Sequence, residues 1–441
     1  MKTFVPSLLV ALLLPVGMAQ AQTLTTVVWF DGTDGHYPHS TLIQATDGNL
    51  YGSTTGTTIN GDYGTIFKMT PKGALSTLVY FNSTNANGGA PWAGLMQAKD
   101  GSFYGFGGFG IIKMTSSGGL TDLVNANNSI SFGGSFGNLT QGTDGNLYGI
   151  GFGGLYNKGV IFSMTTNGTL TDLADFDGTN GEYEIGYNGL TLGKDGNFYG
   201  ATGGGTSEDI GADDGVVFRM TTNGVLTTLV NFSGTNDNGY YPHGGLIQAS
   251  DGNFYGTTWG GNAADDGTVF RMTPEGTLAT LVRFNGVNGE APYAGMIQAS
   301  DGNLYGTTAI SVFKLTLNGV LTPIVTFNGT NGSGCYSSLV EVNDGNLYGT
   351  TSGGDYGYGT VFKITGLNLL PSFQSITLSN GTVNLAWNSV SNWTYRVQYT
   401  TNLTDATWTD LPGDVLATNI ISSKTDVAVP TQCFYRLLLL R

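Results

Sequence analysis

Residues Gly245–Phe284 read GLIQASDGNFYGTTWGGNAADDGTVFRMTPEGTLATLVRF, and this string carries the pattern that decides the fold. Short runs of alternating apolar residues are separated by turn signals, first Asp-Gly and then Pro-Glu-Gly. Asp-Gly pairs accept the positive φ angles that tight hairpins need. The string therefore predicts four short antiparallel strands.

The same string recurs along the chain. The motif DGN(L/F)YG, with DGSFYG in one copy, occurs seven times at intervals of 43 to 56 residues. The copies begin at Asp47, Asp100, Asp144, Asp195, Asp251, Asp301 and Asp344. Tandem four-stranded units hide their strand edges when they pack radially. Seven units predict an all-β protein with a seven-bladed β-propeller, and a solenoid is the alternative.

The two ends of the repeat region favour a ring. Leu24–Phe30, LTTVVWF, matches the fourth-strand sequence LTTLVNF at Leu226–Phe232, although it precedes the first unit. The last unit stops after its third strand, Gly359–Thr365. We therefore expect Leu24–Phe30 to close the ring by completing the last blade. Leu370–Ile376 is the alternative for that edge, although Pro371 would weaken it as a strand.

Spacing within the units separates fixed turns from variable loops. The fourth-strand leucine follows the third-strand anchor by eight positions, as from Phe270 to Leu278. From the motif aspartate to that anchor the distance varies between 12 and 23 residues. The variable loops and the segments before each unit should share one side of the ring, the loop face. The Asp-Gly turns should share the other, the turn face.

Composition supports an all-β chain and excludes several protein classes. The 441 residues include 71 glycines and 12 prolines, and only 11% are charged, which fits neither collagen, nor a coiled coil, nor a disordered chain. Lys and Arg total 16 against 31 Asp and Glu, a net charge of −15. Scattered basic residues on an acidic protein argue against binding to nucleic acid or to anionic membranes.

The sequence divides into three parts. Residues 1–22 have a basic start, a short apolar core and an Ala-Gln-Ala exit, which predicts a signal peptide and a secreted or cell-surface protein without membrane insertion. Residues 23–366 hold the propeller repeats. Residues 367–441 lack the repeat and alternate as strands, which predicts a small β-sandwich of fibronectin-III or immunoglobulin type. We expect a monomer.

The strings GLIQAxDGNLYGTTxxGG and GTVFKMT resemble the Gloeobacter/Verrucomicrobia (GloVer) tandem repeat of secreted bacterial proteins. The resemblance covers residues 23–366 and implies a secreted protein with a variable C-terminal module, but no activity. The fragment DGNLYG with a following Lys/Arg-Met-Thr also resembles blades of streptogramin lyase and gluconolactonase propellers.

Residues present in every unit are interpreted as scaffold. The motif aspartates should accept backbone N–H bonds in their hairpin turns. The recurrent basic residues of the third strand should pack between blades with their charged ends near those aspartates. These residues are Lys68, Lys113, Arg219, Arg271, Lys314 and Lys363. A ligand site should instead break the symmetry.

Aromatic residues and histidines of the loop face are the candidate ligand-binding residues. They are Trp92, Trp259, His39, His243, Tyr240 and Tyr241. His36 and Tyr183 are further symmetry-breaking residues. The two histidines of the YPH strings belong to the first and fifth units, so a metal shared between them would need an unusually narrow channel. Aromatic rings with nearby Asn and Asp residues favour a glycan as the ligand.

Acidic loops of units four and five are candidate calcium sites. Their residues are Glu208, Asp209, Asp213, Asp214, Asp265 and Asp266. The sequence contains no EF-hand-like alternation, so a solvated acidic loop is the favoured interpretation. Calcium remains the one cofactor that the sequence raises.

The sequence favours a non-catalytic propeller that binds an extracellular polymer on its loop face, with a glycan preferred to a protein. A propeller enzyme of lyase, lactonase or glycoside-active type is the alternative, with Glu182 and Glu184 as a weak carboxylate pair. A protein-interaction scaffold is the third possibility. Cys335 and Cys433 should lie on opposite sides of the ring and remain unpaired.

Overall fold

The structure is a computed structural model. It describes residues 22–58, 63–82, 90–91, 93–107, 110–125, 137–182, 189–204, 215–232, 238–261, 266–354, 357–367, 373–379, 381–389, 394–402, 407–418, 421–427 and 433–440. Every regular element in these ranges is a β-strand. The predicted signal peptide lies outside the described residues except for Gln22.

The repeats form seven four-stranded antiparallel sheets, one for each unit. The first strands are β2 (Ile43–Gln44), β6 (Met96–Gln97), β10 (Thr140–Gln141), β14 (Thr191–Leu192), β18 (Ile247–Gln248), β22 (Ile297–Gln298) and β26 (Val340–Glu341). The second strands are β3 (Leu50–Thr54), β7 (Phe103–Gly107), β11 (Leu147–Gly151), β15 (Phe198–Thr202), β19 (Phe254–Thr258), β23 (Leu304–Thr307) and β27 (Leu347–Thr351).

The outer half of each sheet consists of its third and fourth strands. The third strands are β4 (Thr65–Met69), β8 (Gly110–Met114), β12 (Val160–Met164), β16 (Val216–Met220), β20 (Thr268–Met272), β24 (Ser311–Leu315) and β28 (Thr360–Thr365). The fourth strands are β5 (Leu75–Tyr80), β9 (Leu120–Asn125), β13 (Leu170–Asp175), β17 (Leu226–Asn231), β21 (Leu278–Arg283), β25 (Leu321–Thr326) and, for the seventh sheet, β1 (Thr23–Trp29).

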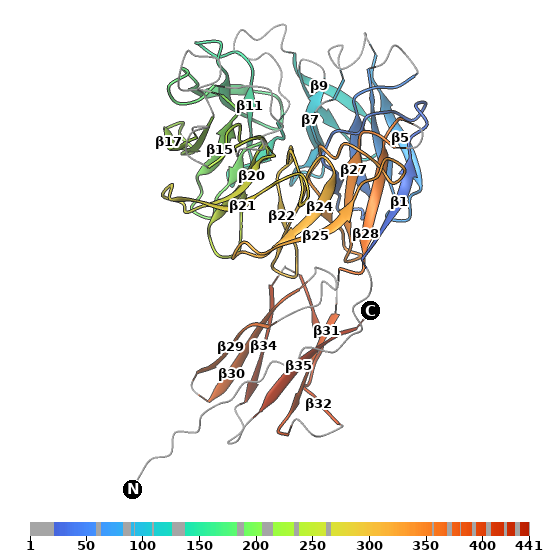
Figure 1. Ribbon diagram of the computed structural model, residues 1–441, viewed down its shortest axis with the longest axis vertical. Coiled ribbons are helices and arrows are strands. Elements are labelled where there is room, and N and C mark those ends of the chain that lie inside the picture. The colour runs from blue at the N-terminus through green and yellow to red at the C-terminus, as the bar shows by residue number, and fades with distance from the viewer. Residues whose placement is uncertain are drawn as a thin grey trace.

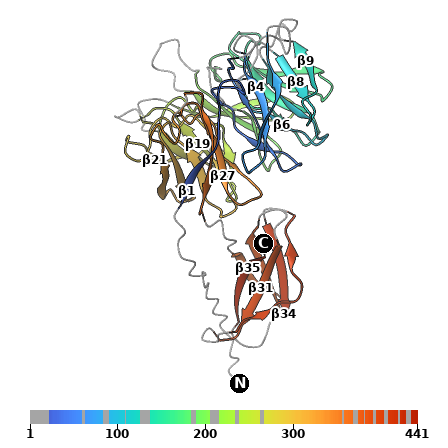
Figure 2. The same ribbon diagram turned by 90° about the vertical axis from the view of Figure 1, so that its right-hand side faces the viewer.

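Strand β1 takes the fourth position of the last sheet, whose order is β1-β28-β27-β26. It runs antiparallel to β28, with Leu24 opposite Ile364, and a bulge interrupts the register between Thr26 and Val28. The pairing of β4 with β5 has a bulge at the corresponding place. Figure 2 shows β1 in blue alongside the orange strands of the last sheet. The N-terminal strand is thus paired as its sequence predicts.

In six of the seven units a glycine of the second strand admits an aromatic ring from the neighbouring third strand, and in the second unit Ile112 takes the place of that ring. In the unit quoted first, a Cβ atom on Gly256 would lie 2.5 Å from Cζ of Phe270. Phe270 is opposite Gly256 in the ladder and fully buried. A distance this short leaves no room for a side chain at position 256. The packing of the sheet therefore explains why the motif DGN(L/F)YG has a glycine there.

The core lies between consecutive sheets. The ring of Tyr51 in the first sheet lies 4.4 Å from that of Phe103 in the second, centroid to centroid. One cluster joins the seventh sheet to the first and includes Tyr348, Val361, Leu50 and Phe67. Each sheet is therefore covered on both sides, as the low polarity of its second strand requires.

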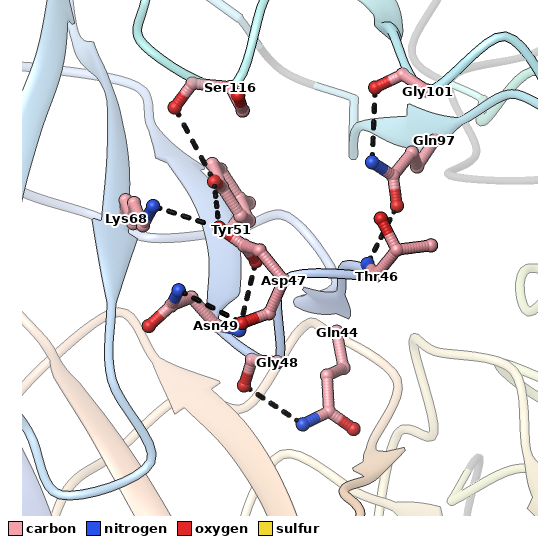
Figure 3. A network of polar contacts seen from close by, with 10 residues as sticks. All are labelled: Gln44, Thr46, Asp47, Gly48, Asn49, Tyr51, Lys68, Gln97, Gly101 and Ser116. Carbon is pink, nitrogen blue, oxygen red and sulfur yellow. Dashed lines mark hydrogen bonds and ion pairs between the residues drawn. The ribbon is translucent and has the colours of Figure 1, made fainter.

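The aspartates of the repeat motif have the structural role that the sequence predicts. Figure 3 shows Asp47, whose Oδ1 accepts the backbone N–H of Asn49 at 3.0 Å. Its Oδ2 accepts from the Tyr51 hydroxyl at 2.9 Å and from Lys68 Nζ at 2.8 Å. Burial raises the pKa of Asp47, but these bonds together hold it well below its usual range. The charged end of Lys68 is thereby fixed beside the turn.

The strands after the repeats form two further sheets, shown in red in Figure 1. One contains β29 (Phe373–Ser379), β30 (Thr382–Asn388) and β34 (Ile421–Val427). The other contains β31 (Thr394–Thr400), β32 (Thr409–Asp410), β33 (Val415–Leu416) and β35 (Phe434–Leu440). Their common core includes the buried Trp387 and Tyr395. Because β29 pairs with β30, it does not fill the edge of the last repeat sheet.

No helix in the described part of the chain is long and apolar enough to cross a membrane.

Candidate functional site

The first strands and the residues before them surround one cavity, here called the shared cavity, of about 250 Å³. All seven repeat sheets contribute to its wall. The contributing residues are His39–Thr41, Gly94, Asn138, Thr140, Gly189–Thr191, Gly245–Leu246, Tyr293–Ile297, Tyr336 and Ser338–Leu339. Most of these side chains are small, which leaves the space open.

One position of the repeat supplies the aromatic and histidine residues of this wall. It lies three residues before the leucine or methionine that precedes each first strand. In chain order it is occupied by His39, Trp92, Phe136, Tyr187, His243, Tyr293 and Tyr336. Trp92, Phe136 and Tyr187 lie outside the described residues. Every unit thus has an aromatic residue or a histidine here.

The four described members of this position form a continuous arc, here called the aromatic arc. His39 stacks on Tyr336 with ring centroids 5.1 Å apart and planes at 29°. Tyr336 lies 4.9 Å from Tyr293, and Tyr293 lies 5.5 Å from His243. Nδ1 of His243 is also 3.3 Å from the Tyr293 carbonyl oxygen. The two histidines are therefore connected through two tyrosines.

The residue two positions before each member of the arc has a left-handed backbone conformation. The φ angles are 55° at Tyr37, 51° at Tyr241, 45° at Ala291 and 66° at Gly334. This region is unfavourable for residues with a Cβ atom and persists only where neighbouring contacts hold it. At Tyr241 the carbonyl accepts the backbone N–H of Trp259 at 2.9 Å. A recurrent strained turn therefore sets the direction in which the chain enters the arc.

The shared cavity is electrically neutral. Its described wall contains no Asp, Glu, Lys or Arg residue, although the whole chain has a net charge of −15. Burial lowers the pKa of His39 to about 4, so its imidazole is uncharged at neutral pH. Burial also raises the pKa of Tyr336, which keeps the phenol protonated. Such a wall offers ring faces, hydroxyl groups and amides to a ligand.

The remaining predicted aromatic residues form a second cluster. Tyr240 and Tyr241 have ring centroids 5.3 Å apart, and Trp259 lies 6.5 and 6.3 Å from them. Backbone hydrogen bonds between Tyr240 and Gly260 connect the leading segment to the end of β19. Pro242 alone separates this cluster from His243 of the arc. The candidate residues of unit five are thus close together, Tyr240, Tyr241 and Trp259 through their rings and His243 through the chain.

Most of the predicted acidic residues lie outside the described residues, namely Glu184, Glu208, Asp209, Asp213, Asp214 and Asp265, as does Tyr183. Asp266 is described, and its backbone carbonyl accepts the N–H of Ala291 at 3.0 Å. Glu182 forms an ion pair with Lys158 at 2.9 Å. The described residues contain no group of three or more His, Cys, Asp or Glu side chains placed to hold a metal ion.

Cys335 and Cys433 are both buried and unpaired, as the sequence predicts. The Cys335 thiol lies 3.2 Å from the Thr350 carbonyl oxygen, within the seventh sheet. Burial raises its pKa to about 12, so the sulfur stays protonated. This cysteine belongs to the packing of the sheet.

Sequence reasoning found His39 and His243 but missed Tyr293 and Tyr336. It searched for residues that break the repeat symmetry, whereas the arc occupies one position that is aromatic or histidine in every unit. Aligning the units on their first strands would have identified it. At that single position the units differ only in which of His, Tyr, Trp and Phe they carry.

Solved structures with similar folds include two bacterial proteins. The first is described as the extracellular domain of the hybrid two component system BT4673 from B. thetaiotaomicron, with a TM-score of 0.52 and 12% identity over 95% of this chain and 59% of that chain. The present chain thus spans less than two thirds of that relative. A gluconolactonase from Xanthomonas campestris gives a TM-score of 0.38 and 12% identity over 60% of this chain and 82% of that chain.

The all-β fold is accordingly β-propeller-like, and at these identities the likeness concerns the fold alone. No curated protein matches the sequence. Residues 187–404 match the family model of the Gloeobacter/Verrucomicrobia repeat, in agreement with the motif found along the chain.

Proposed function

We propose that the repeat sheets are the blades of one seven-bladed β-propeller, closed by β1 and spanning residues 23–366. Hydrogen bonds between consecutive sheets support this arrangement. The backbone N–H of Thr46 in the first unit donates to Gln97 of the second, and that of Ser250 in the fifth donates to Gln298 of the sixth. The seventh unit is bonded in the same way to the first. Residues 367–441 then form a separate sandwich of fibronectin-III or immunoglobulin type.

The proposed function of this propeller is to bind a neutral extracellular glycan on its loop face without catalysis. The observation that carries the proposal is the aromatic arc of His39, Tyr336, Tyr293 and His243 beside an uncharged cavity. Pyranose rings present apolar faces that stack on aromatic side chains, while their hydroxyl groups need hydrogen-bond partners. The arc supplies the first kind of contact. Ser, Thr and Asn residues of the cavity wall supply the second.

The second aromatic cluster extends this surface. Tyr240, Tyr241 and Trp259 follow directly from His243, so further sugar units of a polymer would contact them. Trp92 shares the repeat position of the arc and is proposed as another member of it. Calcium in the acidic loops, with Asp266 the described member, remains a proposal for bridging a glycan.

A secreted or cell-surface location is proposed from the signal-peptide pattern of residues 1–22. A catalytic alternative would need two or three ionisable groups that converge on the ligand with perturbed pKa values. Among the described wall residues the ionisable side chains are the imidazole of His39 and the phenols of Tyr293 and Tyr336, and burial lowers the pKa of His39 to about 4, so that its imidazole is neutral. This composition favours binding over turnover.

The test is a screen of neutral, acidic and sulfated polysaccharides for binding and for product release. We expect neutral glycans to bind, no new reducing ends or unsaturated products to form, and Tyr336→Ala and Tyr293→Ala to weaken binding about tenfold, which is about 1.4 kcal/mol each. Tyr156→Ala is the matched control, because Tyr156 is 55% exposed and lies outside the arc. Product release, or equal binding by all variants, would contradict the proposal.

A further inference from the structure

The shared cavity is small for a polymer site. Its volume of about 250 Å³ falls below the range of roughly 300 to 1,000 Å³ that is usual for pockets holding drug-sized ligands. All seven repeat sheets contribute to its wall, so it does not continue sideways as a groove between two of them. A sugar chain that lay across the loop face would pass over this cavity without filling it.

One amide side chain belongs to the walls of two cavities. Asn138 lines both the shared cavity and a second cavity on the side of the Asp-Gly turns, where Gln44, Gln97 and Asn343 contribute. Its Oδ1 accepts the backbone N–H of Gly94 at 2.8 Å. The corresponding residues of the other units are Gly, Ser or Thr. The wall of the shared cavity therefore combines aromatic rings with one fixed amide.

We infer that the cavity takes the uncharged end of a glycan chain, with one terminal sugar unit inside and the following units over Tyr240, Tyr241 and Trp259. This inference rests on the proposed function and specifies how the same site is used. An internal unit would have to bring its neighbours on both sides with it, and a volume of about 250 Å³ is small for three sugar units. Charged terminal units, such as uronic acids, would lose hydration without gaining an ion pair.

One glycine makes the cavity testable. A Cβ atom on Gly245 would meet no heavy atom within 4 Å, although Gly245 lines the cavity. A Cβ atom on Gly295 would approach the Gly245 carbonyl oxygen to 2.7 Å, and one on Gly94 would approach Asn138 to 2.7 Å. Gly245→Leu therefore fills the cavity without displacing backbone. Gly245→Ala leaves most of the space open and is its matched control.

The experiment uses the full chain and titrates linear hexasaccharides against cyclic glucans, which have no chain ends. The probes are maltohexaose and laminarihexaose, with cyclomaltohexaose and cyclic β-glucan as their respective end-free partners. We expect the linear form of the recognised linkage to bind at least tenfold more tightly than its cyclic form. Gly245→Leu should lose at least tenfold in affinity, while Gly245→Ala stays within threefold and both melt as the wild type does.

Glycans of different length distinguish binding in the cavity from binding over the second aromatic cluster. Trp259→Ala should weaken hexasaccharide binding and leave monosaccharide binding unchanged, because the terminal unit does not reach this cluster. Equal binding of linear and cyclic glucans, or unchanged binding by Gly245→Leu, would overturn the inference that the cavity takes the end of a chain. The proposed function would still be tested separately by the binding of Tyr336→Ala. Failure of every glycan to bind would overturn both.

Discussion

The backbone N–H of Asn343 donates a hydrogen bond to Oε1 of Gln44 at 2.9 Å, although 299 residues separate the two in the chain. Asn343 belongs to the last repeat unit and Gln44 to the first. The same bond joins Lys99 to Gln141 at 2.9 Å and follows the order of the units. The contact between the two ends of the repeat region is thus an ordinary contact between neighbouring units.

Gln44→Leu should destabilise the protein by about 1 to 2 kcal/mol, because Gln44 makes two hydrogen bonds. Its Oε1 accepts from Asn343 and its Nε2 donates to the Gly48 carbonyl oxygen at 3.0 Å. Leucine occupies this position in the fourth unit, as Leu192, so it is compatible with the strand. Urea denaturation measures the change. Unaltered stability would mean that this contact contributes nothing to holding the first and last units together.

The sequence predicted the strand pattern and the place of β1, because both depend on local information. Leu24 opposite Ile364 follows from the likeness of LTTVVWF to the fourth strands of other units. The shared cavity could not be predicted in this way. Its wall combines residues from all seven sheets, and the stacking of His39 on Tyr336 depends on how sheets far apart in sequence approach one another.

The two cysteine thiols should be unreactive in the folded protein. Cys335 is fully buried and burial raises its pKa to about 12, so the reactive thiolate is scarce at pH 8. Iodoacetamide should modify neither Cys335 nor Cys433 without denaturant, and a reductant should leave the melting temperature unchanged. Mass spectrometry of the intact protein measures both thiols. A drop in melting temperature on reduction would reveal a disulfide.

Asp34→Asn should stabilise the protein above pH 6. Burial raises the pKa of Asp34 to about 6, and the nearby Asp31 adds to this effect. The equivalent residues Asn180 and Asn331 each donate from Nδ2 to the carbonyl oxygen five residues earlier, which a carboxylate cannot do. We expect a gain of about 1 kcal/mol at pH 7.5, reduced from the full effect of the shift because the side chain is partly exposed.

The sign of this pH dependence follows from proton binding. Between pH 4 and 6 the folded protein retains a proton on Asp34 that the unfolded chain releases, so stability falls as the pH rises through this window. The Asp34→Asn variant has no carboxyl group at this position, so its stability does not fall in this way. Its advantage over the wild type in urea denaturation should therefore grow from pH 4 to pH 7.5. A constant difference across this range would show that Asp34 does not titrate with the raised pKa.

Glu341→Gln should likewise stabilise the protein at neutral pH. Glutamine occupies this position in five units, where Nε2 donates to the glycine carbonyl four residues later, as from Gln298 to Gly302 at 2.8 Å. Glu341 instead accepts from the backbone N–H of Ser300 at 2.9 Å and from its hydroxyl. Burial raises the pKa of Glu341, and the negative charge of the nearby Asp301 raises it further. The two hydrogen bonds from Ser300 lower this pKa but do not cancel the rise.

The variant keeps an acceptor for the Ser300 N–H, gains a donor toward Gly345 and removes a buried charge, so we expect about 1 kcal/mol of added stability at pH 7. Because the raised pKa means that stability falls with rising pH, the gain should shrink as the pH is lowered toward 4. Glu341 and Asp34 lie on opposite faces of different units, so the two gains should add within about 0.5 kcal/mol. A destabilised Glu341→Gln variant would show that the ionised carboxylate, held by Ser300, is the favoured partner in the seventh unit.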